Sequence, residues 1–147
     1  MDCYTCKSNS GERPISPGPT IYAGERWRIE HAYPCGMKGW LVIVLNRHAE
    51  ALHELTAEEF SELSQLTETT VRALRGHLQC EKEYMVCFAE AEHFNHIHVH
   101  VIAKPRGLPQ ELRGTAIFKM LHVTENEVIP PDQVAELCLQ LQPYFRP

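Results

Sequence analysis

Residues 96–102 read His96-Ile97-His98-Val99-His100-Val101-Ile102, with histidines on three alternate positions and branched apolar residues between them. Strict alternation with β-branched residues predicts a β-strand, because successive side chains of a strand point to opposite faces. The three imidazoles would therefore share one face of the strand, and the apolar residues would be buried on the other. Three titratable rings on one face need an explanation.

Length and charge restrict the class of protein. The chain has 147 residues and a formal net charge of -5 at pH 7, which suits one domain with a substantial core. A negative charge argues against broad binding to nucleic acid or to an anionic membrane, since both depend on a positive field. The longest apolar stretch, Trp40 to Leu45, is far shorter than a membrane span, and the N-terminus lacks the apolar core of a secretion signal. We therefore expect a cytoplasmic protein with no nucleic acid or membrane partner.

Three further segments have the patterns of strands. Residues 27–31 alternate apolar and polar side chains, which predicts a strand with one solvent-facing side. The continuous apolar run over 40–45 is typical of a central strand covered on both faces. Tyr84 to Phe88 is a fourth candidate, and the short loop after it allows antiparallel pairing with the histidine strand.

The helical signals lie in the middle and at the end of the chain. Thr56-Ala57-Glu58-Glu59 has the form of a capping box. Apolar residues then recur at helical spacing, namely Phe60, Leu63, Leu66, Val71, Leu74 and Leu78. Residues 7–20 are rich in Ser, Gly and Pro and predict an irregular arm. A short apolar segment over 117–123 and a last helix from about Asp132 to Leu141 follow the histidine strand. The sequence thus predicts an α+β fold, with an antiparallel sheet packed against one long helix.

Alternating imidazoles permit more than one kind of chemistry. An imidazole with a pKa of about 6.5 is mostly uncharged near neutrality, and its lone pair can attack phosphorus without a separate base. A second imidazole two residues along, about 6.6 Å away between α-carbons, can donate to the same phosphate. The rings can instead converge on a metal ion, or serve only packing or surface roles. The residues alone leave catalysis, metal binding and packing open.

Cys3-Tyr4-Thr5-Cys6 is a second chemical pattern. This spacing is common in zinc sites, because two thiolates from one tight turn fit two corners of a tetrahedron. An idle terminus is the alternative interpretation. Two histidines from elsewhere in the chain would complete a Cys₂His₂ set and favour zinc.

The histidine segment resembles the defining motif of the histidine triad (HIT) family, His-φ-His-φ-His-φ-φ with φ apolar, at every position from 96 to 102. Upstream, Gly39 to His48 is similar to the glycine, apolar strand and histidine block of that family. The resemblance covers roughly residues 22–104. It implies a single HIT-like domain over 1–147, with a zinc-anchored arm over 1–20, a core over 22–104 and a C-terminal extension over 105–147, usually assembled as a homodimer.

The resemblance also implies an activity, that of a nucleotidyl hydrolase or transferase, with a hydrolase favoured over a phosphorylase. In the family the middle triad histidine attacks the α-phosphate and forms a nucleotidyl-histidine intermediate, a role that falls here on His98. The third histidine, His100, would contact the phosphate. Diadenosine polyphosphates and nucleoside phosphoramidates are the expected substrate classes. The alternatives are a metal-dependent module that holds an ion on all three triad histidines and a nucleotide-binding module without catalysis.

Members that begin with Cys-x-x-Cys bind a structural zinc. The resemblance therefore implies four zinc ligands, which are Cys3, Cys6, His48 and His96.

The chain departs from the family pattern beside the triad and along the preceding strands. Where many members carry Gly-Gln before the triad, this chain has Ala91-Glu92-His93, so that Glu92 takes the place of the phosphate-holding glutamine and His93 is a substitute donor. His31 falls near the position of a ribose-binding polar residue, or simply ends a strand. The Gly-His opening of the upstream block is Gly39-Trp40 here. The basic residues that follow the triad have two interpretations, a local positive field for an anionic substrate or the commoner one of solvation at the surface; they are Lys104, Arg106 and Arg113.

Overall fold

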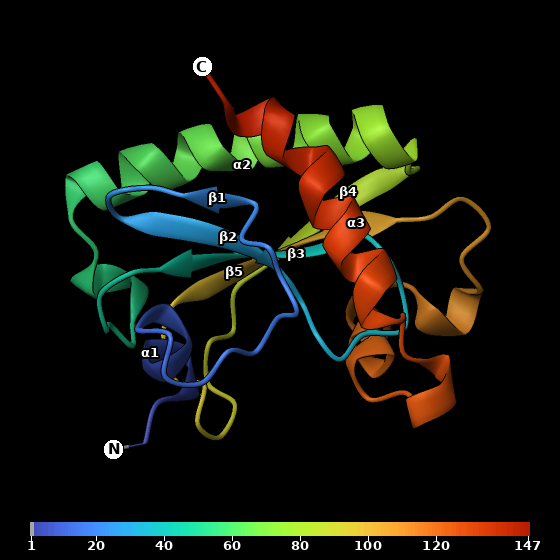
Figure 1. Ribbon diagram of the computed structural model, residues 1–147, viewed down its shortest axis with the longest axis horizontal. Coiled ribbons are helices and arrows are strands. Elements are labelled where there is room, and N and C mark those ends of the chain that lie inside the picture. Colours follow the sequence, from blue (N-terminus) through green and yellow to red (C-terminus); the bar gives the residue numbers. More distant parts are fainter. Residues whose placement is uncertain (1) are drawn as a thin grey trace.

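The computed structural model describes residues 2–147, and within them a five-stranded antiparallel sheet forms the centre of the protein. The strands are β1 (Tyr22–Ala23), β2 (Trp27–His31), β3 (Trp40–Leu45), β4 (Lys82–Val86) and β5 (His98–Lys104). The helices are α1 (Tyr4–Asn9), α2 (Ala57–Leu78) and α3 (Pro131–Leu141). The strand order is β1-β2-β3-β5-β4, and α2 lies along one face of the sheet (Figure 1). The predicted α+β fold is confirmed.

The register of the central strands sorts their side chains into two faces. Ile29 lies opposite Ile43, which lies opposite Val99, and all three are buried against the α2 side of the sheet. The neighbouring residues of each strand point to the other face. Arg28, Val44 and His98 form one row across that face, and Glu30, Val42 and His100 form the next.

Helix α2 begins where the sequence predicts. The Oγ1 of Thr56 accepts a hydrogen bond from the backbone of Glu59 at 3.1 Å, and a Glu59 carboxylate oxygen accepts one from the backbone of Thr56 at 2.8 Å. Leu63 and Leu74 are buried as predicted, whereas Phe60 is 45% exposed. Phe60 lies about a quarter turn from the centre of the buried stripe, so the prediction that it belongs to the apolar face is wrong.

The N-terminal arm is less irregular than its composition predicts. Residues 4–9 form α1, so the predicted irregular arm over 7–20 is wrong for residues 7–9. The Sγ of Cys3 caps this helix by accepting a hydrogen bond of 3.3 Å from the backbone of Cys6. Cysteine is not a usual capping residue, so no N-cap pattern predicted a helix at this position. Asn9 donates to the backbone oxygens of Leu45 and Asn46 and so fastens the end of α1 to the end of β3.

Two strand boundaries differ from the predictions. β4 covers Lys82–Val86 rather than Tyr84–Phe88, and it pairs antiparallel with β5 as expected. β5 begins at His98, so His96 precedes the strand in a bend.

The C-terminal segment packs in two places, with a 3₁₀ helix on the face of the sheet away from α2 and α3 against the core cluster that includes residues of α2. A 3₁₀ helix, η3 (Gly114–Leu121), places Phe118 edge-on to the rings of Trp40 and His100, each at a centroid distance of 5.1 Å. The predicted last helix is confirmed as α3, which buries Val134 and Leu141. None of the helices in the described residues is long and apolar enough to cross a membrane.

Candidate active site and metal cluster

A cavity of about 740 Å³ opens on the face of the sheet opposite α2. Its floor consists of the two side-chain rows defined by the strand register, which include His98, His100, Arg28 and Glu30. Its walls come from α1, from the loop over 88–94 and from the C-terminal segment around Phe118. Segments far apart in the sequence therefore enclose two of the triad histidines.

His98 has its tautomer fixed by the backbone. Its Nδ1 donates a hydrogen bond of 2.6 Å to the carbonyl oxygen of His96, which places the proton on Nδ1 and the lone pair on Nε2. No group of residues 2–147 forms a hydrogen bond with that Nε2. Burial lowers the pKa of His98, so the ring is neutral near pH 7. The geometry thus gives a free lone pair on a side chain that lines the cavity.

His100 has the opposite tautomer. The indole Nε1 of Trp40 donates a hydrogen bond of 2.9 Å to Nδ1 of His100. Because an indole nitrogen can only donate, Nδ1 of His100 carries a lone pair and its proton lies on Nε2. Burial lowers the pKa of His100 to about 4, with a smaller contribution from His98. The two rings meet edge to face at 5.0 Å between centroids, so a lone pair and an N–H donor stand side by side.

His31 borders the cavity, but both of its ring nitrogens are bonded to the backbone. Nδ1 donates to the carbonyl oxygen of Ala32 at 2.7 Å, and Nε2 accepts from the backbone of Gly39 at 3.0 Å. The side chain is 1% exposed, and burial lowers its pKa. Its role in ribose binding stays a prediction, while its observed contacts are those of a histidine that ends a strand.

Glu92 and His93 lie on the loop before the triad and differ in their contacts. Glu92 is at the rim of the cavity with its side chain 90% exposed, and one carboxylate oxygen lies 3.6 Å from Nε2 of His93. The ring of His93 stacks on Tyr4 at 4.3 Å, and its Nδ1 donates to the backbone oxygen of Asp2 at 3.3 Å. His93 is thus bound to the N-terminal arm and does not line the cavity. Substrate binding by either residue stays a prediction.

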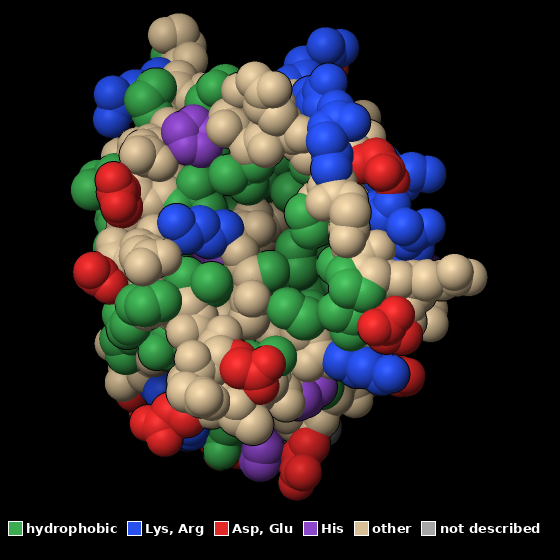
Figure 2. Space-filling model, turned by 90° about the vertical axis from the view of Figure 1, so that its right-hand side faces the viewer, with side chains coloured by type: hydrophobic (Ala, Val, Ile, Leu, Met, Phe, Trp, Pro, Cys, Tyr) green, Lys and Arg blue, Asp and Glu red, His purple; other side chains and the backbone are tan. Residues whose placement is uncertain are grey.

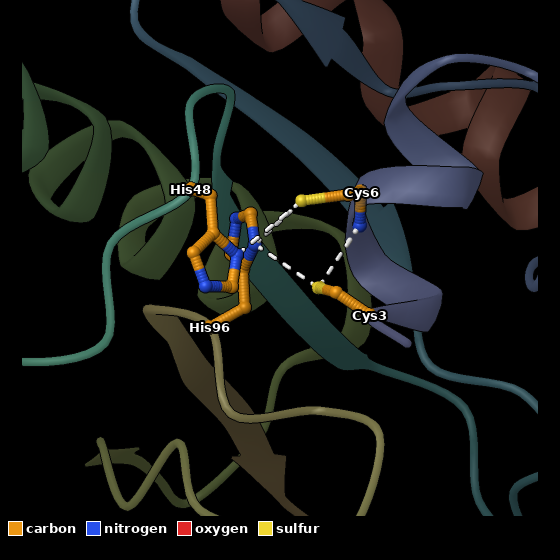
Figure 3. A group of neighbouring side chains, drawn as sticks. All are labelled: Cys3, Cys6, His48 and His96. Atoms are coloured by element: carbon orange, nitrogen blue, oxygen red, sulfur yellow. Dashed lines mark hydrogen bonds between the residues drawn. The ribbon is translucent and has the colours of Figure 1, made fainter. Parts of the chain in front are cut away.

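The four predicted zinc ligands converge beside this cavity. Cys3 and Cys6 come from the start of α1, His48 follows β3 and His96 precedes β5 (Figure 3). Their ligand atoms all lie within 4.8 Å of one another. The Nδ1 of His96 is 3.5 Å from each sulfur, and the Nδ1 of His48 is 3.4 Å from the sulfur of Cys6. A tetrahedron with Zn–S of about 2.3 Å and Zn–N of about 2.0 Å has S···N edges of roughly 3.5 Å, so these residues fit a zinc ion.

The contacts of the Nε2 atoms of His48 and His96 also favour metal binding through Nδ1. Nε2 of His96 donates to the carbonyl oxygen of Leu45 at 2.7 Å, and Nε2 of His48 lies 3.4 Å from a carboxylate oxygen of Glu50. Such contacts place the lone pairs on the Nδ1 atoms that face the sulfurs. Within residues 2–147, this group of potential ligands consists of the two cysteines, His48 and His96, and it does not include His98 or His100.

The basic residues after the triad have contacts elsewhere in the fold. Lys104 is 5% exposed and pairs with Glu81, and Arg113 donates to the backbone oxygen of Leu108. Arg106 lines a second cavity of about 390 Å³ at the end of α2. Figure 2 views the molecule from the side of the C-terminal segment and shows a hollow among hydrophobic side chains with Lys and Arg along part of its edge. None of these three residues lines the triad cavity, so the interpretation as a positive field at that cavity is wrong.

Sequence reasoning missed an ion pair in the floor of the triad cavity. Arg28 donates to a carboxylate oxygen of Glu30, to Asn9 and, at 3.0 Å, to the hydroxyl of Ser8. Glu30 also accepts a hydrogen bond of 2.7 Å from Thr20. The signal was present, because the polar residues of the alternating β2 segment had to share a face with the histidines once the strands were paired.

Comparison with known proteins decides the family. The profile of the HIT domain matches residues 16–107, which is more than half of the chain. The chain belongs to the HIT family. No curated protein sequence matches it at a significant level. The HIT family is one of nucleotide hydrolases and transferases, and the matched range includes the triad but not the two cysteines of α1.

Solved HIT structures share the fold at low sequence identity. A HIT-like protein from Bartonella henselae is 14% identical, with a TM-score of 0.72, and the match covers 98% of this chain and 96% of that chain. A Zn-bound histidine triad family protein from Mycobacterium smegmatis is 18% identical, with a TM-score of 0.66 and 97% of each chain covered. A histidine triad protein from Bradyrhizobium japonicum is 17% identical, with a TM-score of 0.71 and 87% and 90% covered. The overall HIT fold is therefore retained.

Proposed function

We propose that this HIT protein transfers a nucleotidyl group to water through a covalent intermediate on His98. The observation that carries the proposal is the pair of opposite tautomers in the cavity floor. Nε2 of His98 has a lone pair without a partner among residues 2–147, and Trp40 fixes the proton of His100 on Nε2. One ring is suited to attack phosphorus, and the other is suited to donate to an oxygen on the same phosphorus.

The reaction proceeds in two displacements. Nε2 of His98 attacks the α-phosphorus, the bond from phosphorus to the leaving group breaks, and the leaving group departs with the electron pair and takes a proton from solvent. The positive charge on the ring is stabilised by the hydrogen bond from Nδ1 to the carbonyl oxygen of His96. Nε2–H of His100 donates to a non-bridging oxygen as charge develops. Water then attacks phosphorus, the phosphorus–Nε2 bond breaks, and the water proton passes to solvent.

The charges around the cavity favour a substrate with one phosphate. Among the charged side chains of residues 2–147 that line it, Arg28 is the single cation, and Glu30, Glu90 and Glu92 are carboxylates. Since Arg28 is paired with Glu30, the rim carboxylates would repel a polyphosphate chain. We therefore propose nucleoside phosphoramidates, which carry one phosphate, ahead of diadenosine polyphosphates.

The proposed zinc has a structural role. Held by Cys3, Cys6, His48 and His96, it would fix α1 and the start of β5 and so support one wall of the cavity. The homodimer and the cytoplasmic location stay predictions, and light scattering coupled to size-exclusion chromatography tests the first.

Turnover and intact mass together test the proposal. Adenosine 5′-phosphoramidates and diadenosine polyphosphates are supplied at catalytic enzyme concentration, and the protein is weighed after rapid quenching without acid. We expect phosphoramidate turnover and an added mononucleotide mass, both lost in His98→Ala. His53→Ala is the matched control, because His53 is exposed and lies outside the cavity.

Metal analysis of the same variants separates the alternatives. Retained zinc with lost turnover in His98→Ala supports the enzyme, whereas loss of the metal supports a metal-binding module. Absence of turnover with every substrate in the wild-type protein would support a nucleotide-binding module instead.

A further inference from the structure

The ion pair in the cavity floor lies at a fixed distance from the triad. Glu30 on β2 lies opposite Val42 on β3, which lies opposite His100 on β5. Neighbouring strands are about 4.8 Å apart, so the α-carbons of Glu30 and His100 are about 10 Å apart on the same face. The carboxylate is therefore two strands away from the proposed site of phosphoryl chemistry, within one continuous cavity.

One oxygen of this carboxylate is held in place and the other keeps its capacity to accept. Oε1 of Glu30 accepts hydrogen bonds from Thr20 and Arg28. No donor from residues 2–147 contacts Oε2, although the side chain is only 12% exposed. A carboxylate oxygen that is largely removed from solvent gains free energy from a ligand that brings an N–H or O–H to it.

Arg28 keeps the carboxylate in a defined orientation. Its guanidinium bridges Glu30 to two residues of α1, Ser8 and Asn9. Planar guanidinium groups restrict their partners because their N–H groups form a rigid fork. The acceptor is thus fixed before any ligand binds, which is the condition for strong discrimination between ligands.

The cavity floor runs from His98 on β5 across Val44 and Val42 on β3 to Glu30 on β2, so a nucleotide placed for attack by His98 would extend along this floor. The sugar, which is nearer to the phosphorus than the far edge of the base, would lie over Val42 and Val44, whose side chains offer only methyl groups. The edge of the base would reach Glu30. The free carboxylate oxygen therefore meets the base rather than the ribose.

We propose that Glu30 selects a guanine base over an adenine base. Guanine presents two adjacent donors, N1–H and the N2 amino group, which can both point at the free Oε2 while Oε1 keeps its bonds to Thr20 and Arg28. Adenine presents one donor, the N6 amino group, beside a lone pair at N1 that repels a carboxylate oxygen, so it satisfies this acceptor less well than guanine does. This inference rests on the proposed nucleotidyl transfer at His98, because it names the nucleoside of the same substrate.

The test compares two substrates with the same leaving group, the guanosine and adenosine 5′-phosphoramidates. We expect kcat/KM of the wild-type protein to be at least about tenfold higher for the guanosine compound. Glu30→Gln, which replaces one accepting oxygen by a donor, should reduce this preference to about twofold or less. Glu25→Gln is the matched control, because Glu25 precedes the same strand, pairs with Arg26 and lies outside the cavity, and it should leave the preference unchanged.

Equal kcat/KM values for the two substrates in the wild-type protein would overturn the inference, as would a guanosine preference that persists in Glu30→Gln. An equal loss for both substrates in that variant would also overturn it, since it would assign Glu30 to the ribose or to structure alone. Titration calorimetry with GMP and AMP gives a second readout. If neither phosphoramidate is turned over, tighter binding of GMP still supports the inference while the proposed function fails, and equal binding refutes the inference as well.

Discussion

Replacing Trp40 by phenylalanine tests whether the indole sets the tautomer of His100. The substitution removes the N–H that donates to Nδ1 of His100 at 2.9 Å and keeps an aromatic ring in a position that is fully buried. Without that donor, the proton of His100 is free to occupy Nδ1. The ring would then present a lone pair to the phosphate instead of an N–H group.

The size of the effect follows from the hydrogen bond that is lost. A buried acceptor without a donor costs about 1–3 kcal/mol, which should appear in the free energy of unfolding. A neutral hydrogen bond contributes about 1 kcal/mol net, so a partial shift of the tautomer should lower kcat about fivefold. Complete loss of the donor to the developing charge would lower kcat by about 10²–10³-fold, which sets the upper limit.

The assay pairs kinetics with direct observation of the ring. Steady-state kcat and KM are measured with a nucleoside phosphoramidate, and ¹⁵N-labelled histidine reports by NMR which ring nitrogen of His100 is protonated. Trp27→Phe is the matched control, because Trp27 is equally buried and donates to the backbone oxygen of Glu59 on the α2 side of the sheet. Its substitution should lower stability and leave kcat unchanged. The reasoning is refuted if Trp40→Phe keeps the Nε2–H tautomer, or if its kcat equals that of Trp27→Phe.

Two further predictions concern stability. Cys6→Ser should abolish zinc retention in elemental analysis and lower Tm by about 5–10 °C. A chelator should lower the Tm of the wild-type protein by a similar amount. Cys87→Ser is the control and should retain the metal, because Cys87 lies outside the cluster. Hydrogen bonds from Arg47 hold the pKa of the buried Glu59 carboxyl at about 2, below its usual 4.5. The ionised carboxylate therefore stabilises the folded protein above about pH 4.5, and this contribution is lost as the pH falls towards 2. Glu59→Gln should therefore lower the free energy of unfolding by about 1–2 kcal/mol at pH 7, after allowance for solvent at the partly exposed Arg47, and by progressively less between pH 4.5 and pH 2 in urea titrations. A difference that stays constant over that range would contradict this account.

Local sequence patterns were sufficient to predict those elements whose structure depends on the spacing of nearby side chains. The alternation over 27–31, the apolar run over 40–45 and the capping box before α2 each specify an element through contacts within a few residues. The convergence of the four residues predicted as zinc ligands also followed from a family motif, and these residues form a group that could hold a metal ion.

Features that depend on contacts between distant segments could not be predicted in the same way. Nothing near Trp40 in the sequence shows that its indole meets a ring 60 residues later. Helix α1 is capped by a thiol, and the position of Arg106 depends on how the chain turns after β5. In each case the deciding partner belongs to another element, so only the assembled sheet reveals it.

The wall beside His100 comes from a different part of the chain than the floor that holds the triad. Phe118 lies on η3, beyond the matched residues 16–107, yet its ring contacts both Trp40 and His100. Mutations that accumulate in this outer segment can reshape the space beside His100 that the proposed leaving group would use, without altering strand pairing or the position of His98. Related proteins that differ in leaving-group preference would then differ in sequence mainly after the triad, and less within the triad motif by which they are recognised.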